Sequence, residues 1–216
     1  MKKIIPSKLE TGVQKFLYKT IGARIPQRVT PNQITLLGAL GGLFGIVCAA
    51  LSGWNRWFLI GTIAGLMCHL ICDDLDGYVA RTRNMCSKAG GYFDLLTDIL
   101  HITYLIIALA FAGVIHFWAA IFMVPVYALM MFTAMNYILH LDEFLFPRLG
   151  PIETHLFFAG ICLIGMADRG NWNFTLYKYV CNPADIVVLA GGVLMYYEMI
   201  RLQVQLFKRL RQHEKR

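Results

Sequence analysis

The sequence has few charged residues: Asp, Glu, Lys and Arg together make up 15% of its 216 residues. Hydrophobic residues make up 57%, and the mean hydropathy is +0.56. So apolar a composition excludes an ordinary soluble domain and is typical of a membrane protein with several spans. The six cysteines are scattered and form no C-x-x-C pair. They therefore indicate neither a zinc site nor a disulfide framework, and we expect them to pack as small apolar side chains.

The sequence also lacks the marks of repeats, of a secretory leader and of nucleic-acid binding. No cleavage-like site precedes the first apolar run, and no module combines aromatic with basic residues as nucleic-acid binders do. The net charge of +7 therefore indicates membrane topology and contact with anionic lipids. All but three of the 20 Lys and Arg residues flank one side of the expected spans. By the positive-inside rule this side, with both termini, faces the cytoplasm. The three exceptions are Arg56, Arg169 and Lys178.

Apolar stretches long enough to cross a bilayer core of about 30 Å recur along the chain. They predict an all-α polytopic membrane protein whose single domain covers residues 1–216. Thr30 and Pro31 suit the N-cap and the first helical position of the first span. After the last span, residues 207–216 form a basic cytoplasmic tail that continues the helix. The six expected spans cover roughly residues 33–52, 57–76, 91–112, 114–139, 151–167 and 185–206.

Residues 7–22 carry apolar side chains at helical spacing, with Lys8, Lys15 and Lys19 on another face. This pattern predicts an N-terminal interfacial amphipathic helix on the cytoplasmic leaflet. A helix packed on the membrane domain would give the same pattern. In the first span, small residues that allow close helix approach recur. They are Gly38, Gly41, Gly42 and Gly45.

The most informative segment, from Asp73 to Asp98, joins the second and third spans and follows the pattern D-x2-D-G-x2-A-R-x8-G-x3-D-x3-D. At about 100° per residue, its first two acids share one face of the second span and its last two share one face of the third. A short loop would pack these helices antiparallel and bring the four acids together. The fixed residues are Asp73, Asp76, Gly77, Ala80, Arg81, Gly90, Asp94 and Asp98.

Carboxylates inside a membrane are costly unless they are paired, protonated or bound to a cation. Because Mg²⁺ and Mn²⁺ prefer oxygen ligands, the four acids predict a site for one of these ions. Basic groups just outside the acids would meet phosphates, and the small residues would leave space for a ligand or let the helices approach. Such a set suits phosphoryl transfer, in which one carboxylate takes a proton from an attacking hydroxyl. The basic groups are Arg81, Arg83 and Lys88; the small residues are Gly77, Ala80 and Gly90.

The segment from Asp73 to Asp98 resembles the signature of the CDP-alcohol phosphotransferase (CDP-alcohol phosphatidyltransferase) family at every fixed place, and TPNQITLLG from Thr30 to Gly38 resembles the start of the first span in many members. The resemblance implies that a hydroxyl attacks the phosphorus of a CDP-linked substrate and that CMP leaves. It further implies a homodimer. It assigns the Mg²⁺ or Mn²⁺ ligands to Asp73, Asp76 and Asp94, with Asp98 as general base and additional ligand. It places the cytidine diphosphate beside Gly77 and Ala80, and leaves Arg81 as a phosphate contact or a structural partner of an acid.

The family has two branches, which differ in the partner that carries the CDP. A G-P-x-E element, with Glu153 as its acid, is similar to one in choline and ethanolamine phosphotransferases. Glu153 could bind an amine head group, assist deprotonation or cap its helix. A polar stripe in the fourth span, of Thr133, Asn136 and His140, could line the acceptor pocket or form interhelical hydrogen bonds. Because the late spans hold no Lys/Arg cluster at the depth of the acids, we favour a CDP-linked head group as donor and a diacylglycerol-like lipid as acceptor. The alternative is CDP-diacylglycerol with serine, glycerol phosphate or inositol phosphate.

Several other interpretations compete with these. His69 and His101 suit packing or support of the acids better than metal ligation, and Asp74 suits a loop-facing or supporting role. The four acids could form a buried salt-bridge network with Arg81 and Lys88. A cation transporter also needs intramembrane acids, but it would often show inverted repeats and a site near the midplane. A non-catalytic scaffold would not need all four acids.

Overall fold

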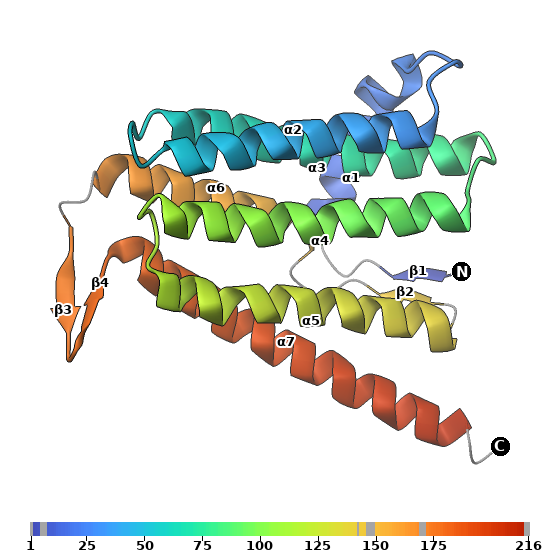
Figure 1. The fold of residues 1–216 in the computed structure, drawn as a ribbon. Coiled ribbons are helices and arrows are strands. Elements are labelled where there is room, and N and C mark those ends of the chain that lie inside the picture. Colours follow the sequence, from blue (N-terminus) through green and yellow to red (C-terminus); the bar gives the residue numbers. More distant parts are fainter. Residues whose placement is uncertain (1, 5–7, 142, 146–149, 169–171, 214–216) are drawn as a thin grey trace.

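The structure is a computed structural model that describes residues 2–4, 8–141, 143–145, 150–168 and 172–213. Long helices run alongside one another, and both ends of the described chain lie on the right in Figure 1. The helices are α1 (Lys8–Thr20), η1 (Gly22–Arg24), α2 (Pro31–Leu51), α3 (Phe58–Thr82), α4 (Lys88–Phe111), α5 (Phe117–Leu141), α6 (Pro151–Asp168) and α7 (Pro183–His213). Two short strand pairs accompany them: β1 (Lys2–Ile4) lies parallel to β2 (Glu143–Leu145), and β3 (Phe174–Leu176) lies antiparallel to β4 (Tyr179–Cys181).

The all-α membrane fold expected from the sequence is confirmed. Helices α2 to α7 lie where the six spans are expected, and α2, α3, α4, α5 and α7 are long and apolar enough to cross a membrane. Helix α6 has 18 residues and carries Glu153, His155 and Asp168, and it falls outside that group of five. Helix α7 continues into the basic tail as far as His213. Residue 7 of the amphipathic segment, Arg148, Arg169 and residues 214–216 lie outside the described residues.

Helix α2 begins with a capping box and then packs closely on α3. The Thr30 side chain accepts from the backbone N of Gln33, while the Gln33 side chain accepts from the backbone N of Thr30. A Cβ on Gly65 of α3 would lie 2.5 Å from the Cα of Gly45, so this crossing requires glycine. A Cβ on Gly38 would lie 2.8 Å from the Cβ of Cys72. The glycines expected to allow close approach therefore do so, and they bring the two helices into register.

A short loop reverses the chain between α3 and α4. Asn84 adopts a φ of 55°, a left-handed conformation that Asn tolerates better than most residues. Ser87 then caps α4, because its Oγ accepts from the backbone N of Gly90 at 3.0 Å. Arg83, expected near phosphates, instead donates to the carbonyl oxygens of Ile25 and Val29 at 2.8 Å each. Its guanidinium therefore organises the segment that leads into α2.

Helix α1 contacts the bundle through polar side chains. Gln14 Nε2 donates to Asp74 Oδ1 of α3 at 2.8 Å and to Glu10 Oε1 at 2.7 Å. Glu10 Oε2 in turn accepts from the backbone N of Ile152, at the start of α6, at 3.3 Å. On the outer side of α1, Phe16 is 65% exposed. The contacts of α1 with α3 and α6 agree with a helix packed on the membrane domain, one of the two interpretations that the sequence left open.

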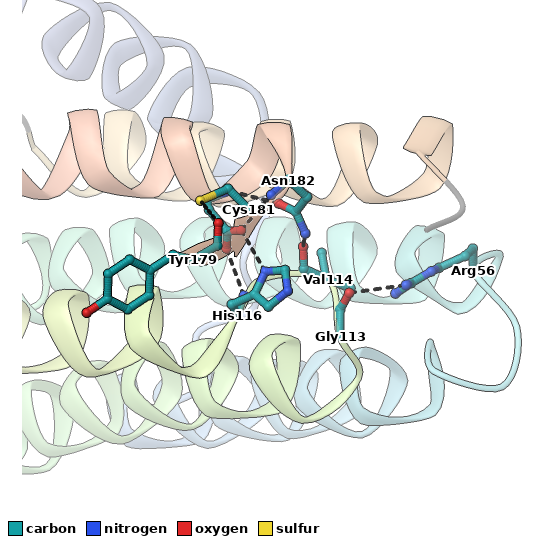
Figure 2. Close-up of polar contacts among 8 residues, drawn as sticks. Arg56, Gly113, Val114, His116, Tyr179, Cys181 and Asn182 are labelled. Carbon is teal, nitrogen blue, oxygen red and sulfur yellow. Dashed lines mark hydrogen bonds and ion pairs between the residues drawn. The ribbon is translucent and has the colours of Figure 1, made fainter. Parts of the chain in front are cut away.

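A polar network connects the starts of α5 and α7, at the end of the bundle away from the loop between α3 and α4 (Figure 2). Asp185 is fully buried and accepts from the backbone N of His116 at 2.7 Å, while its other oxygen lies 2.7 Å from His116 Nδ1. Asn182 and Asp185 cap α7 reciprocally, each side chain accepting from the other's backbone N. Asn182 Nδ2 also donates to the carbonyl of Val114 at 3.0 Å. Arg56 closes the neighbouring turn by donating to the carbonyl of Gly113.

Replacing Asp185 with alanine is expected to lower the midpoint of thermal unfolding in detergent. The change leaves the N–H groups of His116 and Asn182 without their acceptor, at a cost of about 1–3 kcal/mol for each buried group. Asp185→Asn keeps one acceptor oxygen and should lose less stability. An alanine variant that unfolds at the wild-type temperature would contradict this role of the network.

Candidate functional site

Three acids of the sequence motif meet where α3 ends and α4 begins. One carboxylate oxygen from each of Asp73, Asp76 and Asp94 lies within 4.8 Å of the other two. Asp76 is buried, while Asp73 and Asp94 are partly exposed. The helical spacing brought the first two acids to one face of α3, and the reversal after Thr82 placed Asp94 opposite them. The structure therefore brings together three of the four acids that the sequence predicted to converge.

Asp98 lies one turn further along α4 and is not part of this three-acid group. Its Oδ1 lies 3.7 Å from Nε2 of His69, and its side chain is 20% exposed. Asp94 and Asp98 nevertheless share the same face of α4, as their spacing predicts. Asp98 thus stands between the three acids and the buried part of the bundle.

Thr35 of α2 holds Asp76 in place. Its hydroxyl donates to Asp76 Oδ2 in a short hydrogen bond, and the same hydroxyl also contacts the carbonyl of Pro31. Thr35 is not among the residues of the acid motif. In the sequence, Thr35 could have been noticed as a polar residue next to the apolar run of the first span, one helical turn after Pro31. Because α2 packs tightly on α3, this threonine can reach the carboxylate from the neighbouring helix.

Arg81 lies over Gly77 and contacts helix α1. A Cβ on Gly77 would lie 3.0 Å from Nη1 of Arg81, so the guanidinium occupies the space beside this glycine. Nη2 of Arg81 donates to the hydroxyl of Tyr18 at 3.1 Å, and Tyr18 stacks on Tyr78 with ring centroids 4.6 Å apart. Burial raises the pKa of Tyr18 to about 12. Tyr18 is therefore neutral at physiological pH, and its phenol does not compensate the positive charge of Arg81.

The remaining motif residues lie around the same end of the bundle. Ala80 is half-buried on α3, one turn after Asp76. Gly90 is in the first turn of α4, where an added Cβ would lie 3.0 Å from Ser87 Oγ and 3.2 Å from Asn32 Oδ1. Gly90 therefore permits the approach of α2 to the start of α4, which is one of the two roles its size allowed.

The polar residues expected near an acceptor make contacts within the protein. Glu153 Oε2 accepts from the backbone N of Gly150 at 2.9 Å, which is the capping geometry at the start of α6. Thr133 Oγ1 accepts from Gln203 Nε2 at 2.8 Å, which joins α5 to α7. Asn136 donates to the carbonyl of Phe132 in its own helix, and His140 is exposed. These contacts favour the structural interpretation of the stripe.

The three-acid group suits a divalent cation by its donor chemistry. Each donor is a carboxylate oxygen, the ligand that Mg²⁺ and Mn²⁺ prefer. Oxygens bound to one ion at about 2.1 Å lie at most about 4.2 Å apart. Small side-chain shifts would therefore bring Asp73, Asp76 and Asp94, now within 4.8 Å of one another, into contact with a single ion.

Comparison with known proteins points to one family. The sequence model of CDP-alcohol phosphatidyltransferase matches residues 28–200, which run from just before α2 into α7 and include all four acids. The bifunctional IPC transferase and DIPP synthase of Archaeoglobus fulgidus is 36% identical to this chain over 80 residues. That stretch is 36% of this chain and 15% of the relative, so the match covers a small part of the curated protein.

Proposed function

Because the chain belongs to the CDP-alcohol phosphatidyltransferase family, we propose that it is an integral-membrane enzyme of phospholipid synthesis. It transfers a substituted phosphate group from a CDP-linked donor to a hydroxyl acceptor and releases CMP. The observation that carries this proposal is the group of carboxylates from Asp73, Asp76 and Asp94 within 4.8 Å of one another, with Asp98 one turn away. Such a group suits a divalent cation, and a cation held by acids is what a diphosphate donor requires.

In this proposal Asp73, Asp76 and Asp94 hold Mg²⁺ or Mn²⁺, with Asp98 within reach as a further ligand. When bound, the ion neutralises the charge of the donor's diphosphate and orients its phosphorus. Thr35 fixes the carboxylate of Asp76 by its hydrogen bond. Small residues give the cytidine diphosphate room, and Arg81 contacts a phosphate oxygen when it moves off Gly77. The small residues are Gly77, Ala80 and Gly90.

Asp98 is the proposed general base. It takes the proton of the acceptor hydroxyl as the bond from that oxygen to the donor phosphorus forms. The bond from the same phosphorus to the CMP oxygen breaks, and CMP leaves with the electron pair. Asp98 suits this role because it lies beside the three-acid group on the side of the buried bundle, next to His69. A lipid hydroxyl would approach from that side.

For the substrates, we propose a CDP-linked head group as donor and a diacylglycerol-like lipid as acceptor. Helices α5 and α6 contain no Lys or Arg, and Arg201 of α7 donates to Glu198 at 2.6 Å. A phosphorylated acceptor would have few cations to meet there. Glu153 supports the assignment less than its sequence pattern suggests, because one of its oxygens caps α6. The alternative is CDP-diacylglycerol with a small alcohol such as serine, glycerol phosphate or inositol phosphate.

We further propose that residues 1–216 form a single domain with both termini and the acids facing the cytoplasm. The support is the excess of Lys and Arg at the end of the bundle that holds the acids. Because the chain belongs to this family, we propose that it works as a homodimer. Cross-linking in native membranes should then give a species of twice the mass of the chain.

Replacing Gly77 with leucine is expected to weaken binding of a CDP-linked donor by at least about tenfold, which is 1.4 kcal/mol. The new side chain would fill the space that Arg81 now occupies and that the nucleotide needs. The measurement is calorimetry of the detergent-purified protein with CDP-choline. Gly160→Leu is the matched control, because a Cβ at that position would meet no other atom of the described residues within 4 Å, apart from its own helix backbone and chain neighbours. Equal donor affinity in the Gly77 variant would move the nucleotide away from this helix.

To identify the substrates, the purified protein is given a panel of CDP-linked donors together with a lipid extract. The products are then identified by mass spectrometry. A new phospholipid from CDP-choline or CDP-ethanolamine supports the proposed donor. Product from CDP-diacylglycerol and a small alcohol instead would establish the alternative branch. If metal ions cross a vesicle membrane but no CMP forms from any donor, the protein is the cation transporter that its intramembrane acids also suit.

A further inference from the structure

Three buried histidines from three different helices meet directly beneath the acids. They are His69 of α3, His101 of α4 and His155 of α6, with exposed fractions of 3%, 4% and 5%. The ring centroids of His69 and His101 are 4.0 Å apart, and His155 lies 5.6 Å from the first and 5.9 Å from the second. We refer to these residues as the histidine cluster. The sequence suggested packing roles for the first two and gave no reason to place the third beside them.

The histidine cluster contains ring nitrogens with no hydrogen-bond partner among the described residues. They are Nδ1 of His69, both nitrogens of His101 and Nε2 of His155. A buried polar atom left in this state has lost its hydrogen bonds to water without replacement, which destabilises the fold. Four such atoms gathered in one place point to a ligand that satisfies several of them at once.

The surroundings of two of these histidines fix which nitrogen faces the cluster. Nδ1 of His155 lies 2.8 Å from the carbonyl of Pro151, which only accepts, so Nδ1 carries the proton and Nε2 has a free lone pair. Nε2 of His69 faces Asp98 Oδ1 at 3.7 Å, which leaves Nδ1 for the cluster. A histidine that binds a metal usually donates its other N–H to a carboxylate or a carbonyl in this way. His155 already has this support from Pro151, and Asp98 lies 3.7 Å from the nitrogen of His69 that would need it.

We propose that the histidine cluster binds a first-row transition-metal ion, with Zn²⁺ as the best fit. One nitrogen from each of the three residues lies within 4.8 Å of the other two. Around a tetrahedral ion with Zn–N bonds of about 2.0 Å, such nitrogens lie about 3.3 Å apart, so the rings must draw together slightly. Imidazole nitrogens select zinc, copper, nickel or cobalt over Mg²⁺. The site therefore differs in metal preference from the three-acid group above it.

The helix packing leaves room for this arrangement at one glycine. A Cβ on Gly42 of α2 would lie 2.9 Å from Cδ2 of His101 and 3.1 Å from Cδ2 of His69. Any larger residue would push both rings away from their present positions. The absence of a side chain at Gly42 thus lets two of the three ligands lie side by side in the bundle.

Cobalt binding tests the proposal without any measurement of enzyme activity. The full-length protein is purified in detergent, stripped with EDTA, freed of the chelator and titrated with Co²⁺ in the presence of excess Mg²⁺. We expect the visible absorption bands of four-coordinate Co²⁺ at a single equivalent per chain, and their loss when Zn²⁺ is added. The excess Mg²⁺ occupies the acids, so the bands report on the nitrogen ligands.

The decisive variant is His101→Phe, which keeps an aromatic ring and loses no hydrogen bond of the described structure. It should elute as wild type in size-exclusion chromatography and show no cobalt bands. His155→Gln is the second variant and should lose the bands as well. Asp94→Asn and His140→Gln, which change the acids and an exposed histidine, should keep them. Absence of stoichiometric Co²⁺ in the wild type, or bands that persist in a folded His101 or His155 variant, would overturn the proposal.

Discussion

Replacing Asp94 with asparagine is expected to lower turnover by about 10³-fold or more and to weaken Mg²⁺ or Mn²⁺ binding. Asp94 is the carboxylate that α4 contributes opposite Asp73 and Asp76 of α3. Without it the proposed ion loses a ligand and the means of bridging the two helices. Metal stabilisation of a phosphoryl-transfer transition state amounts to several kcal/mol, and each 1.36 kcal/mol corresponds to tenfold in rate.

The measurement for Asp94→Asn is metal affinity by calorimetry together with CMP release from the donor that the wild type uses. Asp74→Asn is the matched control, because Asp74 is a buried acid of α3, next to Asp73 in the chain, and its side chain accepts a hydrogen bond from Gln14. It makes the same chemical change outside the three-acid group and should keep near-normal metal affinity. Near-normal turnover in the Asp94 variant, and likewise in Asp76→Asn, would remove the ligand assignment.

Asp98→Asn is the second change with a large expected effect, and it should separate binding from chemistry. The variant is expected to bind metal and donor within about tenfold of wild type, or roughly 1.4 kcal/mol. Its turnover should fall by about 10²–10⁴-fold, the range for loss of a general base. The reason is that Asp98 lies outside the three-acid group, yet is near enough to take a proton from a hydroxyl at the metal-bound phosphate.

Single-turnover CMP release measured beside donor calorimetry distinguishes the roles of Asp98. Asparagine keeps the shape and one oxygen ligand, so a binding defect is not expected. If the variant releases CMP at the wild-type rate, Asp98 is not the base. If it loses metal binding altogether, Asp98 is an essential ligand, and Glu153 or His155 becomes the next candidate for the base.

The positions of the helices could be predicted because they depend on local properties of the chain. Apolar length places the spans, and the Thr30–Pro31 pair places the start of α2 at the observed residue. The convergence of Asp73, Asp76 and Asp94 follows from helical periodicity and one short reversing loop. Each of these predictions needs only the identities of residues near one another in the sequence.

Contacts between distant segments could not be predicted in this way. Glu10 and Gln14 lie on the polar side of α1, which an amphipathic pattern assigns to water, yet they bind α3 and the start of α6. Arg83 next to the acids suggested a phosphate contact, but the carbonyls of the segment before α2 take up its guanidinium. His155 joins the histidine cluster only because α6 packs beside α3 and α4. These outcomes depend on helix packing, which the local pattern does not contain.

The parallel pairing of β1 with β2 was also beyond the sequence. Each strand has three residues, and the two lie about 140 positions apart in the chain. The strands are too short to show the two-residue alternation of apolar and polar side chains. They can be recognised only once the helices have brought them together.

CMP release by the purified protein in lipid vesicles is the direct test of the proposed transfer reaction. The protein is given CDP-choline, CDP-ethanolamine or CDP-diacylglycerol with lipid and small-alcohol acceptors, with Mg²⁺ or Mn²⁺ and then with excess EDTA. We expect at least one of these donors to yield CMP and a matching phospholipid, and EDTA to stop the formation of both. Undiminished release in EDTA, or no CMP from any of these donors with the metal present, would contradict the proposed reaction.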